Sequence, residues 1–300
     1  GTFYPCRMEY NDYLRWVAVQ FAEQSRYGEQ VLRVEPVVEA DGRVQRLNVI
    51  SQNQQGREVS RQTRSVIVST GGTPKIPPAF AGFKDDPRVF HHARYLSAMA
   101  TQACNRGESM RIAVVGAGQS AAEAFIDLSD NYPNVQVDMI LRAAVLKPAD
   151  DSPFVNEIFG PDYTDLVFNQ PETERERLIR EYHNTNYSVV DLDLIERIYA
   201  ILYRQKVSGS ERHAFLCRRM IESAIDVDGR VQLQLRDLAT GSSEARRYDA
   251  VILATGYERR SHRELLAPLK DYLDDFRVDR DYQLLASPEL ETPVFIQGFS

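Results

Sequence analysis

The sequence has few cysteines, and none of them is paired along the chain. Cys6, Cys104 and Cys217 lie far apart, and no Cys-x-x-Cys motif occurs. This spacing argues against a structural zinc site and against a redox-active dithiol, and it fits a reducing cytoplasm. The five histidines show no metal-ligand spacing either. We therefore expect a cytoplasmic protein without a bound metal.

The sequence also has no excess of basic residues and no long apolar run. Its 36 Lys and Arg residues are outnumbered by 43 Asp and Glu residues, for a net charge of −7. This balance argues against nucleic acid or an anionic membrane surface as a partner. No apolar run approaches the ~20 residues that span a bilayer. We expect no integral membrane segment.

What the sequence does have is an internal repeat of β structure. One region turns at Asp41-Gly42 and closes in the apolar strand "SVIVSTGG"; the other turns at Asp228-Gly229 and closes in "AVILATGY". The repeat predicts an α/β fold with two Rossmann-like dinucleotide-binding domains. No strand and glycine turn precede the first copy, so we expect the opening half of that domain to lie outside this chain.

The predicted domains follow from these two copies. We expect residues 1–73 to be the later part of a first, incomplete domain, and residues 259–300 to return to it through the strand in "TPVFIQGFS". Residues 74–258 form the second domain, with a helical insertion at about 143–215. Apolar periodicity predicts helices over 9–27, 172–182 and 190–206, whereas the Pro-rich stretch from 74 to about 110 is typical of a linker.

The second domain opens with the stretch "RIAVVGAGQSAAEAF", an apolar strand, a glycine turn and a small-residue helix. Gly116 permits the tight turn, and Gly118 lets the backbone approach a pyrophosphate. The helix start at Gln119 and Ser120 offers free N–H groups and a hydroxyl. We interpret the motif as a dinucleotide site, the alternative being a turn that only joins strand and helix.

The next strand, Val135 to Arg142, indicates which dinucleotide binds. NAD and FAD sites usually carry an acidic residue at the end of this strand. Here the strand ends in Arg142, and no carboxylate stands beside it. A guanidinium suits a 2′-phosphate, which favours NADPH. The alternative is an ordinary surface arginine.

A longer motif resembles a known family. "DAVILATGYERRSH", residues 249–262, matches the Asp-x-x-x-Leu-Ala-Thr-Gly-Tyr-x-x-x-x-His signature of the flavin-dependent N-hydroxylating monooxygenases. "KPADDSPFVNEIFGPDYTDL" and "REYHNTNYSVVDLDLIERIY" are similar to the amino-acid-binding segments of L-ornithine N-hydroxylases. The resemblance covers essentially all 300 residues, and it includes the bacterial enzymes of pyoverdine-type siderophore biosynthesis.

The resemblance implies an enzyme that uses FAD, NADPH and O2 to hydroxylate the side-chain amine of L-ornithine. It implies that Asn156 accepts a hydrogen bond from that amine, and that Asn186 holds the substrate carboxylate or carbonyl, with Thr185 and Tyr187 lining the same site. Neutral amides suit this chemistry, because a carboxylate would stabilise the unreactive ammonium form. Asn residues that only bond their own turns are the alternative.

The resemblance also places Arg7 at the junction of flavin and NADPH, unless it is only a solvated residue at a helix start. The NADPH domain would be inserted in the FAD domain, beside a small helical substrate lobe. The resemblance also implies a homo-oligomer, specifically a tetramer. No general base stands out in the sequence. The family's flavin-binding glycine motif and substrate-carboxylate lysine would precede Gly1, and its Gly-Leu-Ser-Asp segment would follow Ser300.

Two other functions remain open from sequence. One is an L-lysine N6-hydroxylase, since one methylene in a pocket is worth only about 1–3 kcal/mol. The other is a non-catalytic fragment that only binds NADP.

A fingerprint of flavin monooxygenases that ends in His-x-x-x-Tyr is partly matched by His91 and Tyr95, with Pro87 in place of its glycine.

Overall fold

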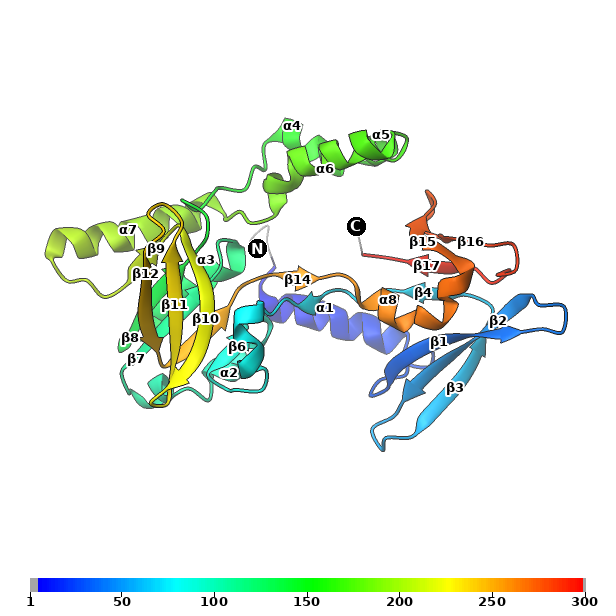
Figure 1. The fold of residues 1–300 in the computed structure, drawn as a ribbon, viewed down its shortest axis with the longest axis horizontal. Helices are drawn as coiled ribbons and strands as arrows, with labels where there is room; N and C mark the ends of the chain where they lie inside the picture. Colours follow the sequence, from blue (N-terminus) through cyan, green and yellow to red (C-terminus); the bar gives the residue numbers. More distant parts are fainter. Residues whose placement is uncertain (1–4, 299–300) are drawn as a thin grey trace. The chain divides into compact units, whose positions relative to one another are not determined.

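A computed structural model describes residues 5–298 of the chain (Figure 1). Contacts within the chain divide it into two compact units, residues 1–73 with 259–300 and residues 74–258. The second unit therefore interrupts the sequence of the first. Which cofactor each unit binds stays a prediction.

The second unit is built on a five-stranded parallel sheet in the order β6-β13-β7-β8-β9. These strands are Val89–His91, Ala250–Leu253, Met110–Val115, Val135–Ile140 and Ala214–Leu216. All neighbouring strands in it are parallel. Because helices cross over between such strands, the sheet confirms the predicted α/β class.

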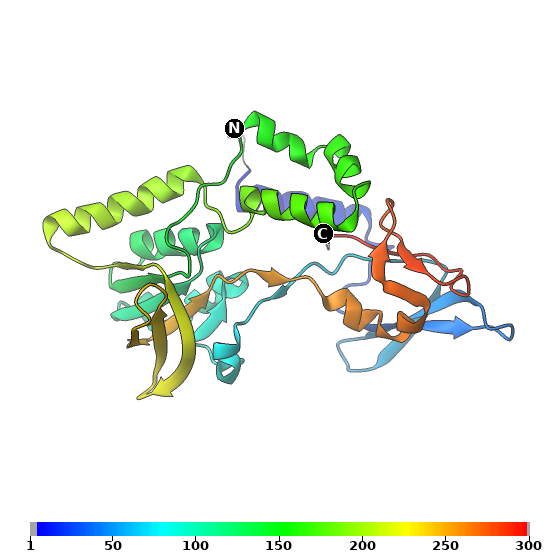
Figure 2. The same ribbon diagram turned by 45° about the horizontal axis from the view of Figure 1, so that its top comes forward.

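Both faces of this sheet are covered. On β7, Ile112 and Val114 join a core that includes α3 (Gln119–Asn131) and α7 (Leu192–Ser208), whereas Ala113 joins a second core with β10–β12. Figure 2 shows the two helices on one side of the sheet and the β10–β12 meander on the other. Successive side chains of a strand point to opposite faces, so the continuous apolar run of β7 serves both cores.

The meander consists of three antiparallel strands, β10 (Arg219–Val227), β11 (Arg230–Asp237) and β12 (Ser243–Tyr248). Its first hairpin turns at Asp228-Gly229, as predicted, and both residues have positive φ (53° and 77°). This pair of angles is typical of the type I′ turn that two-residue hairpin loops favour.

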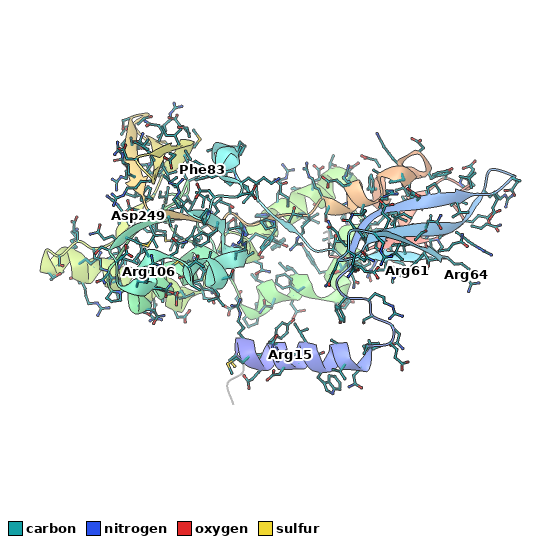
Figure 3. The ribbon with its side chains drawn as sticks, turned by 90° about the horizontal axis from the view of Figure 1, so that it is seen from below. Arg15, Arg61, Arg64, Phe83, Arg106 and Asp249 are labelled. Carbon is teal, nitrogen blue, oxygen red and sulfur yellow. The ribbon has the colours of Figure 1, made fainter. Side chains whose placement is uncertain are left out.

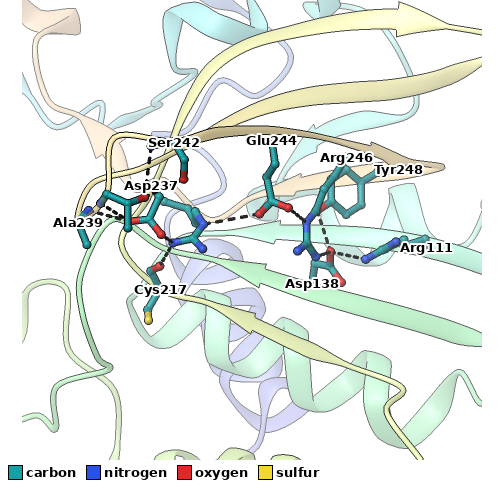
Figure 4. Close-up of polar contacts among 11 residues, drawn as sticks. Arg111, Asp138, Cys217, Asp237, Ala239, Ser242, Glu244, Arg246 and Tyr248 are labelled. Atoms are coloured by element: carbon teal, nitrogen blue, oxygen red, sulfur yellow. Dashed lines mark hydrogen bonds and ion pairs between the residues drawn. The ribbon is translucent and has the colours of Figure 1, made fainter.

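A buried carboxylate joins the meander to the sheet (Figure 4). Asp138 lies on β8, and its side chain is only 3% exposed. One of its oxygens accepts hydrogen bonds from Arg111 (2.8 Å), Arg246 (3.1 Å) and the Tyr248 hydroxyl (2.8 Å). Burial, together with the charge of Asp138, raises the pKa of Tyr248, so its hydroxyl stays protonated and donates.

The helical insertion contains four short elements before α7. They are α4 (Pro153–Asn156), η4 (Glu157–Phe159), α5 (Pro161–Phe168) and α6 (Glu172–Asn186). None of them contains a buried residue. The helices predicted over 172–182 and 190–206 are confirmed: α6 begins at the predicted residue and ends four residues later, and α7 is shifted by two residues at both ends.

The prediction of a linker from 74 to 110 is wrong. Val89–His91 forms β6, one of the two edge strands of the parallel sheet, and pairs with β13. The stretch also contains η1 (Pro78–Phe83), η2 (His92–Arg94), α2 (Tyr95–Met99) and η3 (Ala103–Arg106). A three-residue strand among prolines carries too few residues for a periodic signal, which is why the sequence did not reveal it.

The first unit has its own antiparallel meander, β1 (Gln30–Val38), β2 (Val44–Gln52) and β3 (Glu58–Thr63). The chain turns between β1 and β2 at the predicted Asp41-Gly42, here within a five-residue loop. Besides helix α1 (Arg7–Gln20), the unit contains β4 (Val66–Val68), α8 (Ser261–Leu265), η5 (Ala267–Tyr272), β15 (Leu273–Val278), β16 (Leu284–Ala286) and β17 (Val294–Ile296). The predicted return strand is β17, and it pairs in parallel with β4. Two further short strands, β5 (Thr73–Pro74) and β14 (Tyr257–Glu258), pair with each other.

Helix α1 (Arg7–Gln20) is shorter than the predicted 9–27. It ends because the chain tightens into turns in which Ala22 N–H donates to Val19 and Gln24 N–H donates to Phe21. No residue of α1 is buried; Figure 3 labels Arg15 on this helix. Within residues 5–298, no helix combines the length and hydropathy of a membrane span.

Candidate nucleotide and substrate site

The glycine turn between β7 and α3 has no room for a side chain at its first glycine. Gly116 has φ of 150°, and a Cβ there would lie 2.3 Å from the Ala254 carbonyl oxygen. The turn is further held by a hydrogen bond from Gly116 N–H to the Ile140 carbonyl (3.0 Å). Ala254, directly after β13, therefore leaves no space for a Cβ at this position, and only glycine fits.

The second glycine, Gly118, is the N-cap of α3 and is not crowded. A Cβ there would meet Ser188 Cα at 3.7 Å, an ordinary contact distance. The fold itself therefore does not demand glycine at this position. The next residue but one, Ser120, is half-buried, and its hydroxyl makes no hydrogen bond to another described residue. The first N–H groups of α3 lie outside the helix's own hydrogen-bond ladder.

Gln119 is engaged with the start of α7. Its side-chain amide donates to the Asp191 carboxylate (2.7 Å) and to Glu123 (3.2 Å), and it accepts from Asp191 N–H (2.9 Å). A direct contact between Gln119 and a nucleotide would therefore come from its backbone rather than from this amide.

Arg142 follows the end of β8 by two residues and is exposed. Between residues 5 and 298, no hydrogen bond or ion pair engages its guanidinium. Its role as the partner of a 2′-phosphate stays a prediction.

The loop after α6 lies directly on the glycine turn. Besides the contact of Ser188 with Gly118, the Val189 carbonyl oxygen lies 3.9 Å from the point that a Cβ on Gly118 would occupy. Val190 is 1% exposed, and its N–H donates to the Lys147 carbonyl (2.9 Å). The segment that contains Thr185, Asn186 and Tyr187 thus leads straight into a loop anchored beside the predicted pyrophosphate position.

The two predicted substrate segments are also tied to each other. Asp150 N–H donates to the Thr185 carbonyl (3.4 Å), and the Asn156 amide donates to the carbonyl of neighbouring Asp151 (2.9 Å). This orientation leaves the Asn156 side-chain oxygen as the end that can accept. Thr185 donates its hydroxyl to the Tyr182 carbonyl (2.7 Å).

Asn186 and Tyr187 are exposed at the end of α6. Tyr187 stacks on His183, with ring centroids 5.0 Å apart, and this contact directs the phenol without burying it. Arg7 belongs to the other unit, where it is the exposed first residue of α1. Its predicted role at a cofactor junction stays a prediction.

Sequence reasoning gave no role to Asp191 and only a partial motif match to His91. Asp191 precedes an apolar helical stripe, a signal that identifies an N-cap but not a partner 72 residues away. His91 is 4% exposed and accepts from Ala93 N–H at Nδ1 (3.2 Å), so Nε2 carries the proton and donates to the Gly256 carbonyl (2.9 Å). Burial, assisted by His92, lowers the pKa of His91, which keeps it neutral.

Comparison with known proteins identifies the family of the chain. The family model described as L-lysine 6-monooxygenase/L-ornithine 5-monooxygenase matches residues 1–259. The chain belongs to this family. A curated member, the L-ornithine N(5)-monooxygenase of Pseudomonas aeruginosa, is 60% identical over 300 residues, which are all of this chain and 68% of that protein.

Solved structures of the family superpose closely on the chain. The ornithine hydroxylase PvdA from Pseudomonas aeruginosa has a TM-score of 0.93 at 59% identity, over all of this chain and 70% of that one. The ornithine N-hydroxylase of Kutzneria sp. 744, solved with reduced FAD, NADP+ and L-ornithine, has a TM-score of 0.89 at 30% identity, over 99% and 71% of the two chains. The family expected from the "DAVILATGYERRSH" motif is confirmed.

Proposed function

We propose that this family member hydroxylates the side-chain amine of L-ornithine and binds NADP(H) at the glycine turn of its second unit. The residues there fit a dinucleotide. Gly118 leaves open the space that a Cβ would occupy, the N-terminus of α3 supplies N–H groups, and Arg142 has no competing partner among the described residues. A bound pyridine nucleotide supplies reducing equivalents.

The observation that supports the substrate proposal is the packing of Ser188 and Val189 on that same turn. The predicted ornithine-binding residues 185–187 directly precede this contact, in the same unit as the predicted nucleotide-binding residues. The role of the protein here is to orient the amine and keep it uncharged. The Asn156 side-chain oxygen accepts one N–H of a neutral amine, and no carboxylate is needed to do so.

FAD is the second proposed cofactor, because the Kutzneria relative was solved with it. In the described part of the first unit no strand, glycine turn and helix follow one another, so Arg7 remains the one residue proposed for contact with a flavin. We assign no step of the reaction to it. The proposed product is N5-hydroxyornithine, a precursor for a pyoverdine-like siderophore, and the proposed assembly is a homo-oligomer in the cytoplasm.

The substrate is tested by measuring hydroxylated product, not NADPH loss, from L-ornithine and L-lysine with FAD and NADPH supplied. We expect more product from ornithine, in line with the 60% identical relative. More product from lysine would support the L-lysine N6-hydroxylase alternative. No product from either, with NADP+ still bound, would support the non-catalytic alternative.

The nucleotide proposal is tested by titrating NADP+ and NAD+ into the protein and its Arg142→Ala variant. Loss of a guanidinium–phosphate contact should weaken NADP+ binding about tenfold and leave NAD+ binding unchanged. Arg106→Ala, another exposed arginine of the same unit, is the matched control. Equal losses for both nucleotides would rule out a 2′-phosphate contact.

A further inference from the structure

The contact between Gln119 and Asp191 joins two parts of the second unit that have different predicted tasks. Gln119 is the first residue of α3, directly after the glycine turn, and Asp191 is the N-cap of α7, directly after the loop from the substrate segment. The two residues form a reciprocal pair. Gln119 donates to the Asp191 carboxylate at 2.7 Å and accepts from the Asp191 backbone N–H at 2.9 Å.

The Asp191 carboxylate does not make the hydrogen bond that an N-cap aspartate normally makes. It makes no side-chain capping bond to its own helix, although capping is the usual reason for aspartate at this position. Its hydrogen bond goes to Gln119 instead. The stability of α7 alone therefore does not explain the geometry of this side chain.

The other anchors of the loop are made by backbone and core. Ser188 lies on Gly118, Val190 is buried and pairs with Lys147, and Ala149 N–H donates to the Val190 carbonyl (3.0 Å). These contacts fix the middle of the loop. Of the anchors described, the Gln119–Asp191 pair is the one made through polar side chains, and it connects the loop to the residue next to the glycine turn.

From these contacts we infer that Gln119 and Asp191 are positioning residues that couple the nucleotide turn to the ornithine-binding segment 185–187. A nucleotide that orders the start of α3 then also steadies the loop through Asp191, and ornithine binds a pre-positioned site. The inference rests on the proposed function for its substrate and nucleotide. Its structural part, the restraint of the loop by the pair, holds or fails without either ligand.

The first test measures the restraint by hydrogen exchange in the protein without ligands. Gln119→Ala and Asp191→Ala should each speed exchange of the backbone amides in 185–191, by about fivefold. The double variant should exchange no faster than Gln119→Ala, because that change already removes both bonds of the pair. Asp191→Asn keeps an oxygen that can accept from Gln119 and should restore slow exchange. The control is Asp193→Asn, which removes a charge from the same first turn of α7 but makes no contact with Gln119.

The second test measures the coupling. NADP+ should slow exchange in 185–191 of the unaltered protein but not in Asp191→Ala. In steady-state assays Asp191→Ala should raise KM for ornithine about fivefold, with kcat little changed, and Asp191→Asn should bring KM back. A structural defect would instead lower kcat and the unfolding temperature together, in the Asn variant as well.

The outcomes separate the two proposals. Unchanged exchange in both alanine variants, or equal effects of Asp193→Asn, would overturn the positioning role. Faster exchange in the alanine variants, with no binding of NADP+ by the unaltered protein, would support the restraint and overturn the proposed nucleotide function. A rise in KM for NADPH alone would overturn the coupling and make Gln119 a direct nucleotide contact.

Discussion

The two closing strands of the repeat have nearly the same sequence but different surroundings. Ile67 in "SVIVSTGG" and Ile252 in "AVILATGY" occupy the same position of the pattern. Ile252 is 0% exposed and Ile67 is 66% exposed. Strand β13 pairs on both sides in a five-stranded sheet, whereas β4 pairs with β17 in a two-stranded one. A continuous apolar sequence thus allows a strand to be buried on both faces. Whether the strand is buried depends on the elements packed beside it in the described structure.

The largest expected difference is between alanine substitutions at these two isoleucines. Ile252→Ala should cost about 3–4 kcal/mol of unfolding free energy, because it leaves a cavity in a closed core. Ile67→Ala should cost less than about 0.5 kcal/mol, because little apolar surface is buried there. Urea unfolding followed by circular dichroism measures both. Similar costs at the two positions would show that β4 is covered in solution.

The polar contacts of the β10–β12 and β1–β3 meanders predict a second, smaller difference in the free energy of unfolding. Asp138→Ala should cost about 2–3 kcal/mol, since it removes the shared acceptor of Arg111, Arg246 and Tyr248 inside the protein. On the first meander Arg61, labelled in Figure 3, bonds to Glu29. The Arg61 side chain is 45% exposed. Arg61→Ala should cost about 0.5 kcal/mol. Unfolding in 0.1 M and 1 M salt provides the check, because only the exposed pair should weaken with salt.

A third difference concerns pH, through a histidine of the second unit. His213 is 6% exposed, accepts from Val137 N–H at Nδ1 (3.1 Å) and contacts the Phe125 ring edge-on. Burial lowers its pKa from 6.5 to about 4, with a smaller contribution from Arg212. The folded state therefore binds fewer protons than the unfolded state between these values. Stability should be full above pH 6.5 and fall by on the order of 2 kcal/mol as the pH drops to 4.

His213→Asn tests this titration, because its amide oxygen can still accept from Val137 but does not titrate. The variant should be less stable at pH 8 and should lose less stability between pH 6.5 and 5, a range in which carboxylates stay ionised. Urea midpoints at pH 8, 6.5 and 5 give the slopes. An unaltered slope in the variant would exclude His213 as the responsible group.

Sequence reasoning predicted the repeat, both Asp-Gly turns, the glycine turn and the long helices, because each is recorded in local periodicity or turn chemistry. It did not predict β6, which has three residues and is a strand only because β13 lies beside it. It also did not predict the pairing of Gln119 with Asp191 or the sharing of Asp138. Those contacts join residues 27 to 110 positions apart, and their geometry exists only once the sheet has formed.

The smallest expected difference in unfolding free energy is between the two Asp-Gly turns, which have the same two residues but different backbone conformations. Asp228 has φ of 53°, which glycine adopts more easily than aspartate, whereas Asp41 has an ordinary negative φ and accepts from Arg43 N–H (3.1 Å). Asp41→Gly should therefore cost about 1 kcal/mol, through the lost hydrogen bond and the freer unfolded chain. Asp228→Gly should be nearly neutral, since relief of the positive φ offsets that entropy and the lost contact with Arg247 is exposed. Urea midpoints of the two variants decide, and equal losses would mean that the two turns share one conformation in solution.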